Sequence, residues 1–241
     1  MRPLFARILW AAVARPVGGG CYAPIGRAMR TARGAGGCAA RMFCALVFFL
    51  ALQRCECIPG KRILVFGATG RTGRRVLAQA LAPGSDYAVS AFVRDRSKVA
   101  LESPKLRLIQ GDVLDRELVL EAVQGHDIVI SALGKLGPAE RVEAIENILE
   151  GMRLHGVTRI VAIGGVGCLQ ITESMRLQES PSFPRFFLKT SQAHWEVCLR
   201  LEASDLDWTF VCAPEIPDDE CTGNYTAVAS FVPGNKPCAK T

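Results

Sequence analysis

Three glycines, Gly67, Gly70 and Gly73, lie within seven residues, between an apolar run and a pattern typical of a helix. Glycine has no Cβ, so it permits tight turns, close approach of another molecule and close packing of a helix on a strand. The spacing predicts a dinucleotide site in which Gly67 forms the turn, Gly70 approaches the pyrophosphate and Gly73 packs under the helix.

Polar residues beside these glycines support phosphate binding. Thr69, Arg71 and Thr72 add hydrogen-bond donors, and the N–H groups of the first helical turn would face the phosphates. No Gly-Lys-Ser or Gly-Lys-Thr follows, which disfavours a nucleotide triphosphatase loop. A purely structural tight turn is the competing interpretation.

Cations follow the second predicted strand: Arg94 comes first, and Arg96 and Lys98 are close behind. At this position an acid would bind the ribose hydroxyls of NAD, whereas a guanidinium suits the extra phosphate of NADP. The sequence therefore predicts that NADP(H) is preferred over NAD(H) and that Arg94 selects it. A solvated basic turn is an equally simple explanation for Arg96 and Lys98.

Alternating elements would position these residues. From residue 61 onward short β-branched runs alternate with helical patterns, which is typical of a parallel sheet covered on both faces. The expected fold class is α/β, a doubly wound, mostly parallel Rossmann-type sheet. Strands are expected at 62–66, 87–93, 106–110, 127–130, 159–163 and 208–211, with at most one more within 225–232. Helices are expected at 71–82, 115–123, 139–155 and 186–203.

The charge distribution argues against a nucleic-acid partner. The chain has 29 basic and 23 acidic residues, and its first 60 residues hold eight arginines and one acid, Glu56. The other 181 residues therefore carry 21 basic and 22 acidic side chains, and they present no basic excess for nucleic acid.

Residues 1–58 are expected to be a targeting or disordered leader before a single domain at 59–241. The segment is rich in arginine and poor in acids, which resembles a mitochondrial transit peptide. The apolar run at 42–52 is shorter than the roughly 20 residues of a membrane span. A secretory signal, a membrane-proximal anchor and a cytoplasmic protein with a mistaken start codon stay open.

The five cysteines after the glycine turn form no Cys-x-x-Cys pair and show no metal-ligand spacing with the three histidines, so no metal site is predicted. Cys168, Cys198 and Cys212 lie in apolar surroundings and are expected to be buried free thiols.

Four motifs occur in a recognisable order: 67–73, Val93-Arg94-Asp95, Gly111-Asp112-Val113 and 131–134. Over about residues 62–225 the chain resembles the NmrA-like, atypical short-chain dehydrogenases, and among them the small NADPH-dependent flavin reductases of the biliverdin reductase B type. The resemblance implies an NAD(P)-binding fold and a small-molecule acceptor, possibly a flavin.

The resemblance also implies roles for particular residues. Asp112 and Val113 would lie beside the adenine. A second stretch would run under the nicotinamide ribose: Ala132, Leu133 and Gly134.

Further positions match the substrate side of these relatives. Gly164 and Gly165 belong to a similar turn, in which the flavin reductases carry serine at the position of Gly165. His194 aligns with a histidine near the substrate pocket, and Glu215 falls where the flavin reductases have another histidine. His194 is equally explained as a helix-surface residue, and Glu215 as a loop carboxylate.

Two departures qualify the resemblance. The Tyr-x-x-x-Lys pair of ordinary short-chain dehydrogenases is absent, since residues 189–194 read Lys-Thr-Ser-Gln-Ala-His. Without that proton donor, hydride transfer to a conjugated acceptor is favoured over carbonyl reduction. Relatives also continue past the motif at 222–225 into another helix and strand, so the sheet is expected to be short at its C-terminal side.

Two functions follow. The first is an NADPH-dependent oxidoreductase that passes hydride to a flavin, a quinone or a similar acceptor, with His194 as the candidate catalytic residue. The second is a non-catalytic NADP(H)-sensing regulator with a protein partner. A nucleotide-sugar epimerase is disfavoured, because it would need the missing tyrosine and a larger C-terminal domain.

Overall fold

The computed structural model describes residues 8–12, 60–213 and 226–232. Six parallel strands form most of its main sheet: β2 (Arg62–Phe66), β3 (Ala88–Val93), β4 (Leu106–Gln110), β5 (Ile128–Ser131), β6 (Arg159–Gly165) and β9 (Asp207–Ala213). Two short strands, β1 (Ile8–Ala12) and β10 (Thr226–Ala229), extend the edge beside β9. The order across the sheet is β10-β1-β9-β6-β5-β2-β3-β4.

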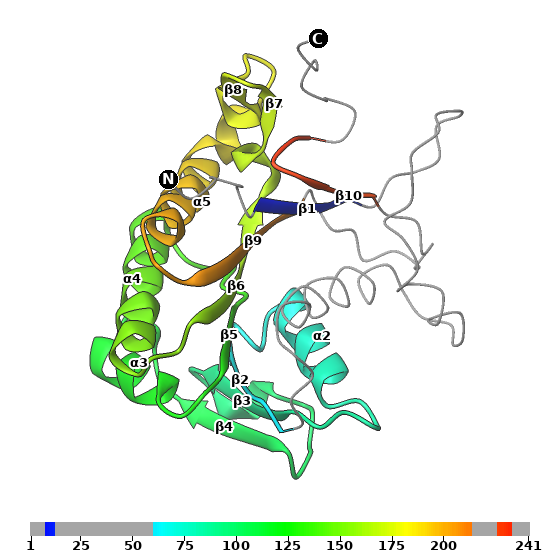
Figure 1. The fold of residues 1–241 in the computed structure, drawn as a ribbon, viewed down its shortest axis with the longest axis vertical. Helices are drawn as coiled ribbons and strands as arrows, with labels where there is room; N and C mark the ends of the chain where they lie inside the picture. The colour runs from blue at the N-terminus through cyan, green and yellow to red at the C-terminus, as the bar shows by residue number, and fades with distance from the viewer. Residues whose placement is uncertain (1–7, 13–59, 214–225, 233–241) are drawn as a thin grey trace.

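Helices cover both faces of this sheet (Figure 1). One face carries α2 (Arg71–Ala80), and the other carries α3 (Arg116–Val123), α4 (Pro138–Leu154) and α5 (Arg185–Glu202). Each face has its own apolar core, because alternate side chains of a strand point to opposite faces. Leu64 and Phe66 of β2 join the α3–α5 side, whereas Ile63 and Val65 join the α2 side. The doubly wound Rossmann-type fold expected from the sequence is confirmed.

Local signals in the sequence explain several element ends. The carboxylate of Asp115 accepts a hydrogen bond from the Leu118 N–H at 3.2 Å and caps α3, as expected. Gly156, with φ of +67°, follows the end of α4. Gly84, with φ of +83°, lies four residues after α2. The observed strands and helices differ from the expected ones by at most two residues at the ends of the six core strands and four helices.

Two features were not expected from the sequence. The segment expected to be a loop between β6 and α5 contains a small hairpin, β7 (Gln170–Thr172) and β8 (Met175–Arg176), between the 3-10 turns η2 (Val166–Cys168) and η3 (Leu177–Glu179). The strand β1 comes from the segment expected to be a leader, and it pairs in parallel with β9 and antiparallel with β10. The domain boundary at residue 59 and the processing of the leader stay predictions.

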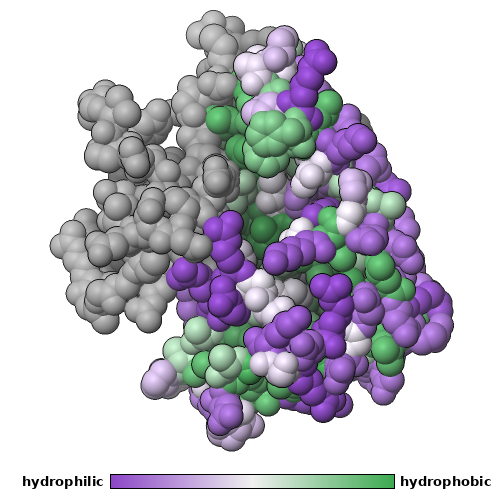
Figure 2. All heavy atoms as spheres, turned by 180° about the vertical axis from the view of Figure 1, so that it is seen from behind, coloured by the Kyte–Doolittle hydropathy of each residue, from purple (hydrophilic) through white to green (hydrophobic). Residues whose placement is uncertain are grey.

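The described surface on the opposite side from Figure 1 is mostly polar, with a recessed apolar area near its middle (Figure 2). Among the described residues, no helix combines the length and the apolarity that a membrane crossing requires.

Candidate functional site

Most of the predicted site residues follow the carboxyl ends of parallel strands and therefore gather at one edge of the sheet. From β2 the chain moves outward through β3 to β4, and then crosses back to β5, β6 and β9 on the other side. The order thus reverses between β2 and β5, which is where open α/β sheets bind their ligands. The glycine turn after β2 and the Ala132–Gly134 stretch after β5 flank this switch point.

The glycine turn has the geometry that the sequence indicated. Gly67 has φ of +74°, and its carbonyl accepts a hydrogen bond from the Gly70 N–H at 3.0 Å. A Cβ on Gly67 would lie 2.4 Å from the carbonyl oxygen of Ala132, so the turn is pressed against the chain after β5. A Cβ on Gly73 would lie 2.2 Å from the carbonyl oxygen of Gly67. These contacts confirm the tight turn at Gly67 and the close packing at Gly73.

The first turn of α2 begins directly behind this loop. Gly70 is its N-cap, and no side chain caps the helix there. Gly70 and Arg71 are exposed, and Thr69 and Thr72 are half-buried. This arrangement of glycine turn and uncapped helix start suits the phosphates of a dinucleotide.

Arg94 lies directly after β3, as expected, and it is exposed. Among the described residues it forms no ion pair, and its carbonyl oxygen accepts a hydrogen bond from the side chain of Gln110 at 3.3 Å. The neighbouring acid, Asp95, is committed to the turn η1 (Arg96–Lys98). Its carboxylate accepts hydrogen bonds from the N–H and hydroxyl of Ser97, at 3.0 and 2.6 Å, and pairs with Lys98 at 3.5 Å.

Those contacts hold the pKa of Asp95 below its usual value, with the Ser97 hydroxyl as the largest cause. The carboxylate is therefore held inside its own turn, and the exposed guanidinium groups of Arg94 and Arg96 form no ion pair with a described residue. Lys98, paired with Asp95, belongs to the turn.

The segment after β4 is held by a turn of its own and by a side chain of α4. Asp112 is exposed, and its carboxylate accepts a hydrogen bond from the Leu114 N–H at 3.1 Å. Val113 is buried, and its carbonyl oxygen accepts a hydrogen bond from the side-chain amide of Asn147 on α4 at 3.1 Å.

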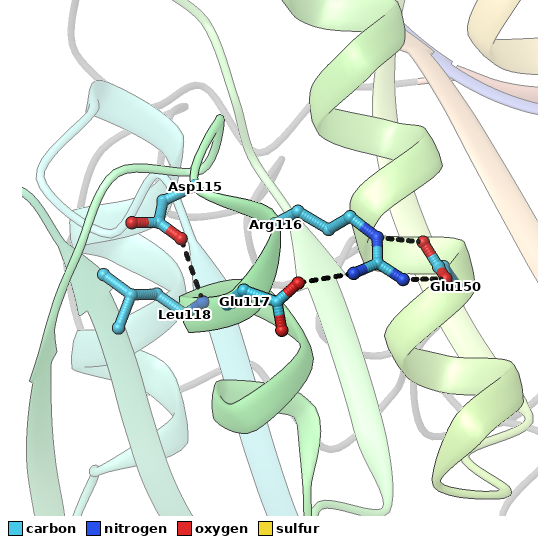
Figure 3. Close-up of polar contacts among 5 residues, drawn as sticks. All are labelled: Asp115, Arg116, Glu117, Leu118 and Glu150. Atoms are coloured by element: carbon cyan, nitrogen blue, oxygen red, sulfur yellow. Dashed lines mark hydrogen bonds and ion pairs between the residues drawn. The ribbon is translucent and has the colours of Figure 1, made fainter.

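A second contact fixes α3 against α4 (Figure 3). Arg116, directly after the capping Asp115, donates hydrogen bonds to both carboxylate oxygens of Glu150, at 2.8 and 2.5 Å. The bidentate geometry restrains the start of α3, which follows the Asp112–Val113 pair.

The chain after β5 is held by one buried side chain that the sequence did not single out. Arg141, in the first turn of α4, has 5% of its surface exposed. Its guanidinium donates hydrogen bonds to the carbonyl oxygens of Leu133 (2.7 Å), Gly134 (2.9 Å) and Leu136 (3.3 Å). The Glu140 carboxylate accepts a hydrogen bond from the Gly137 N–H at 2.8 Å, so the whole loop between β5 and α4 is tied to the helix that follows.

His194 lies on α5, beside the end of β6. A Cβ on Gly165 would lie 3.4 Å from its imidazole ring, so the structure brings the predicted residues Gly165 and His194 together. Burial, and secondly the positive charge of Arg141, lower the pKa of His194 to about 3. The imidazole is therefore neutral at physiological pH and holds no proton beyond its single N–H.

Two polar atoms on this face of α5 have no hydrogen-bond partner among the described residues. They are Nδ1 of His194 and Oγ of Ser191, one turn apart, and both are buried. Ser191 abuts the turn after β6, since a Cβ on Gly167 would lie 2.0 Å from its hydroxyl oxygen. Buried polar atoms without partners are rare and call for a functional or structural explanation.

Three thiols lie behind this turn. Cys168, Cys198 and Cys212 are free and buried, as expected from the sequence. Burial raises the pKa of Cys198 to about 12 and that of Cys212 well above its usual value. These two groups are neutral thiols and poor nucleophiles. Among the described residues no group of histidine, cysteine and acidic side chains could hold a metal ion.

One predicted residue, Glu215, lies outside the described residues. Arg141 was not singled out from the sequence, but its position in the apolar pattern of α4 could have revealed it. It falls in the buried stripe formed with Ala144, Ile145 and Ile148, where an arginine is unusual.

The family model described as NAD(P)H-binding matches residues 67–237, which is most of the chain. The chain belongs to this NAD(P)H-binding family. The matched region begins at the glycine turn and includes both sides of the switch point.

Several proteins are similar to this chain. A Streptococcus pneumoniae protein assigned as an NADH-flavin reductase has a solved structure with a TM-score of 0.61 and 31% identity, covering 73% of this chain and 84% of its own. A chloroplastic Arabidopsis thaliana protein without assigned function is 28% identical over 69% of this chain and 63% of its own length. An isoflavone reductase homologue of Zea mays is 36% identical over 37% of this chain and 31% of its own length. This chain thus spans less than two thirds of these two curated relatives.

An NmrA-like oxidoreductase of Penicillium ochrochloron is 27% identical over 47% of this chain and 37% of its own length. The NmrA-like resemblance expected from the motifs is therefore confirmed at the level of the family.

Proposed function

We propose that this chain is an NADPH-dependent oxidoreductase that passes hydride to a flavin, a quinone or a similar conjugated acceptor. The family supports NAD(P)H binding, and the exposed Arg94 beside the committed carboxylate of Asp95 supports the preference for NADPH. The flavin reductase assignment of the Streptococcus pneumoniae protein supports the acceptor class.

The residues present fit a dinucleotide. Gly67 and Gly73 leave no room for side chains at the turn, and the turn faces the switch point where the pyrophosphate would bind. Thr69, Gly70, Arg71 and Thr72 would surround the phosphates. Arg94 would bind the 2′-phosphate.

The other predicted residues take their proposed places around the two ends of the cofactor. Asp112 and Val113 would flank the adenine, and Ala132, Leu133 and Gly134 would support the nicotinamide ribose. On the acceptor side, Gly164 and Gly165 would form the wall opposite the nicotinamide, with Glu215 at its outer end.

When bound, NADPH supplies the hydride. His194 would orient the acceptor through the neutral N–H or the lone pair of its imidazole, because its lowered pKa leaves no imidazolium to donate a proton at neutral pH. A reduced flavin or quinone can take its proton from water, whereas an alkoxide from a carbonyl needs a donor in the site. The chemistry of the site therefore favours conjugated acceptors.

The first experiment is a titration of the full chain with NADPH and NADH, following nicotinamide fluorescence. Arg94→Ala is expected to weaken NADPH binding by about tenfold to a hundredfold, the size of one or two charge-assisted hydrogen bonds, and to leave NADH unchanged. The matched control is Arg153→Ala, which changes an exposed arginine in the last turn of α4, a helix that does not contain Arg94. Equal losses for both cofactors, or none, would reject Arg94 as the selective residue.

Turnover separates this proposal from its alternative. NADPH oxidation is measured with riboflavin, FMN and a short-chain quinone. Turnover with any of these acceptors supports a reductase, and tight NADPH binding without turnover would reject it.

The second candidate is a non-catalytic NADP(H)-sensing regulator. It is favoured by the same neutral His194, because the lowered pKa of this imidazole leaves no imidazolium beside Gly165 to donate a proton. The decisive readout is the affinity for a protein partner, which would change with the ratio of NADPH to NADP⁺.

We also propose that residues 1–58 direct the protein to an organelle, with the mitochondrion as the first expectation. The arginine-rich segment supports this, as does the chloroplastic location of the Arabidopsis thaliana relative. Sequencing the N-terminus of the native protein tests it: a mature start near residue 59 supports processing, and an intact Met1 contradicts it.

A further inference from the structure

The loop between β5 and α4 has an unusual support. Three of its carbonyl oxygens, those of Leu133, Gly134 and Leu136, accept hydrogen bonds from one buried guanidinium, that of Arg141. Fixing three backbone groups with a single planar, charged fork leaves the loop little freedom to move.

Burying this charge is costly for the protein. Arg141 takes part in none of the ion pairs among the described residues, and its Nε is buried without a hydrogen-bond partner. Desolvation lowers the pKa of its guanidinium. An apolar side chain at this position of α4 would avoid that cost, because its neighbours on the stripe, Ala144 and Ile145, are apolar and buried.

The loop also has a surface available to a ligand. Gly134 is exposed, and a Cβ placed on it would meet no atom within 4 Å. The loop follows Ala132, whose carbonyl oxygen touches the glycine turn at Gly67. The backbone that Arg141 fixes is therefore continuous with the switch point and open on its outer side.

We propose that Arg141 is a positioning residue that holds the Leu133–Leu136 loop in the shape that receives the nicotinamide half of the dinucleotide. This inference rests on the proposed cofactor function. Arg141 acts through the loop carbonyls and does not itself touch the cofactor.

The test compares two ligands that share only the adenine half. NADPH contains both halves, whereas adenosine 2′,5′-bisphosphate ends before the nicotinamide. Arg141→Met keeps the length of the side chain and removes the charge and the donors. We expect it to weaken NADPH by about tenfold, the loss expected for a charge-assisted hydrogen bond, and to leave the bisphosphate within about twofold.

The matched control is Arg200→Met, a half-buried arginine of α5 that pairs with Glu146 of α4 and Glu196. It perturbs the same helix pair without touching the loop, so both affinities are expected to stay at the wild-type values.

Equal losses for NADPH and the bisphosphate in Arg141→Met, or no loss in a folded variant, would overturn the proposal. If that variant does not fold, Arg141→Lys replaces it. A lysine keeps the charge but cannot reach three carbonyls in one fork, so a smaller loss confined to NADPH is expected, and a wild-type ratio of the two affinities would overturn the proposal. Failure of the wild-type chain to bind either ligand would instead contradict the cofactor function itself.

Discussion

In the glycine-turn half of the candidate site, residues 67–73 with Arg94, the turn is closed by contacts among its own residues, whereas in the β5–β6 half the turn after β6 is lined by a residue of a later helix. Gly67, Gly70 and Gly73 contact one another within one turn. In the β5–β6 half, by contrast, the Gly165 turn is lined by His194 of α5.

The two halves also differ in the exposure of their arginine side chains. Arg94 is exposed and open to an anion, while Arg141 is buried and committed to backbone carbonyls. One half can recognise a phosphate directly, and the other supplies shape and a neutral polar surface. A dinucleotide needs both, because its adenine end is anionic and its nicotinamide end is the reacting group.

The largest effect expected on the glycine-turn half comes from one methyl group. Gly73→Ala places a Cβ 2.2 Å from the carbonyl oxygen of Gly67, so we expect a loss of about 3 kcal/mol in the free energy of unfolding and a loss of NADPH binding. In an open helix position the same change would stabilise the protein by about 1 kcal/mol. Denaturant unfolding measures the difference.

The control for this prediction comes from the other half. Gly134→Ala adds a Cβ to open space, so the free energy of unfolding should stay the same or rise slightly. If Gly73→Ala lowered the free energy of unfolding no more than Gly134→Ala does, the close packing of Gly73 against the Gly67 carbonyl would be contradicted.

The next effect concerns the buried histidine of the β5–β6 half. The pKa of His194 is about 3 in the folded protein, below its ordinary 6.5, so the unfolded state binds a proton first as the pH falls. The stability from keeping His194 neutral is complete above pH 6.5. It is lost by about 1.4 kcal/mol per pH unit as the pH falls toward 3.

We therefore expect the free energy of unfolding of wild type to fall more steeply between pH 6.5 and pH 4 than that of His194→Gln. His126, whose pKa burial also lowers, adds a slope of the same sign to both proteins, so it cancels in the comparison. Parallel curves for the two proteins would mean that His194 titrates normally and lies in contact with water.

The smallest effect tests whether the halves act independently. Arg94 and Arg141 share no contact among the described residues, so their effects on NADPH binding should add to within about 0.5 kcal/mol in the double variant Arg94→Ala, Arg141→Met. Titration of the wild type, both single variants and the double variant measures the coupling. A larger coupling would show that the loop after β5 also shapes the phosphate site.

Prediction from the sequence succeeded where a signal and its structural partner lie near each other in the chain. The period of the apolar residues predicted the six core strands and the four helices. Asp115 predicted the start of α3, and the spacing of Gly67 and Gly73 predicted a tight turn in which these two residues contact each other. Each is a local rule of backbone sterics or hydrogen bonding.

Prediction from the sequence failed where a segment pairs with a distant part of the chain or where its residue pattern is weak. The hairpin of β7 and β8 is short and lacks regular alternation, so it was expected to be a loop. Nothing local shows that Ile8–Ala12 pairs with β9, about 200 residues later, since strand pairing at a sheet edge depends on which edge is left open.

The sequence by itself thus determined an α/β chain with a glycine turn after its first core strand and an arginine after the second. These features depend only on the hydrophobic period and the turn-forming residues of short stretches of the chain. Only the tertiary structure decided that Arg141 fixes the loop after β5 and that His194 is neutral. The first depends on the burial of Arg141, and the second depends on the burial of His194 and on the positive charge of Arg141 on another helix. These effects act only once the helices pack on the sheet.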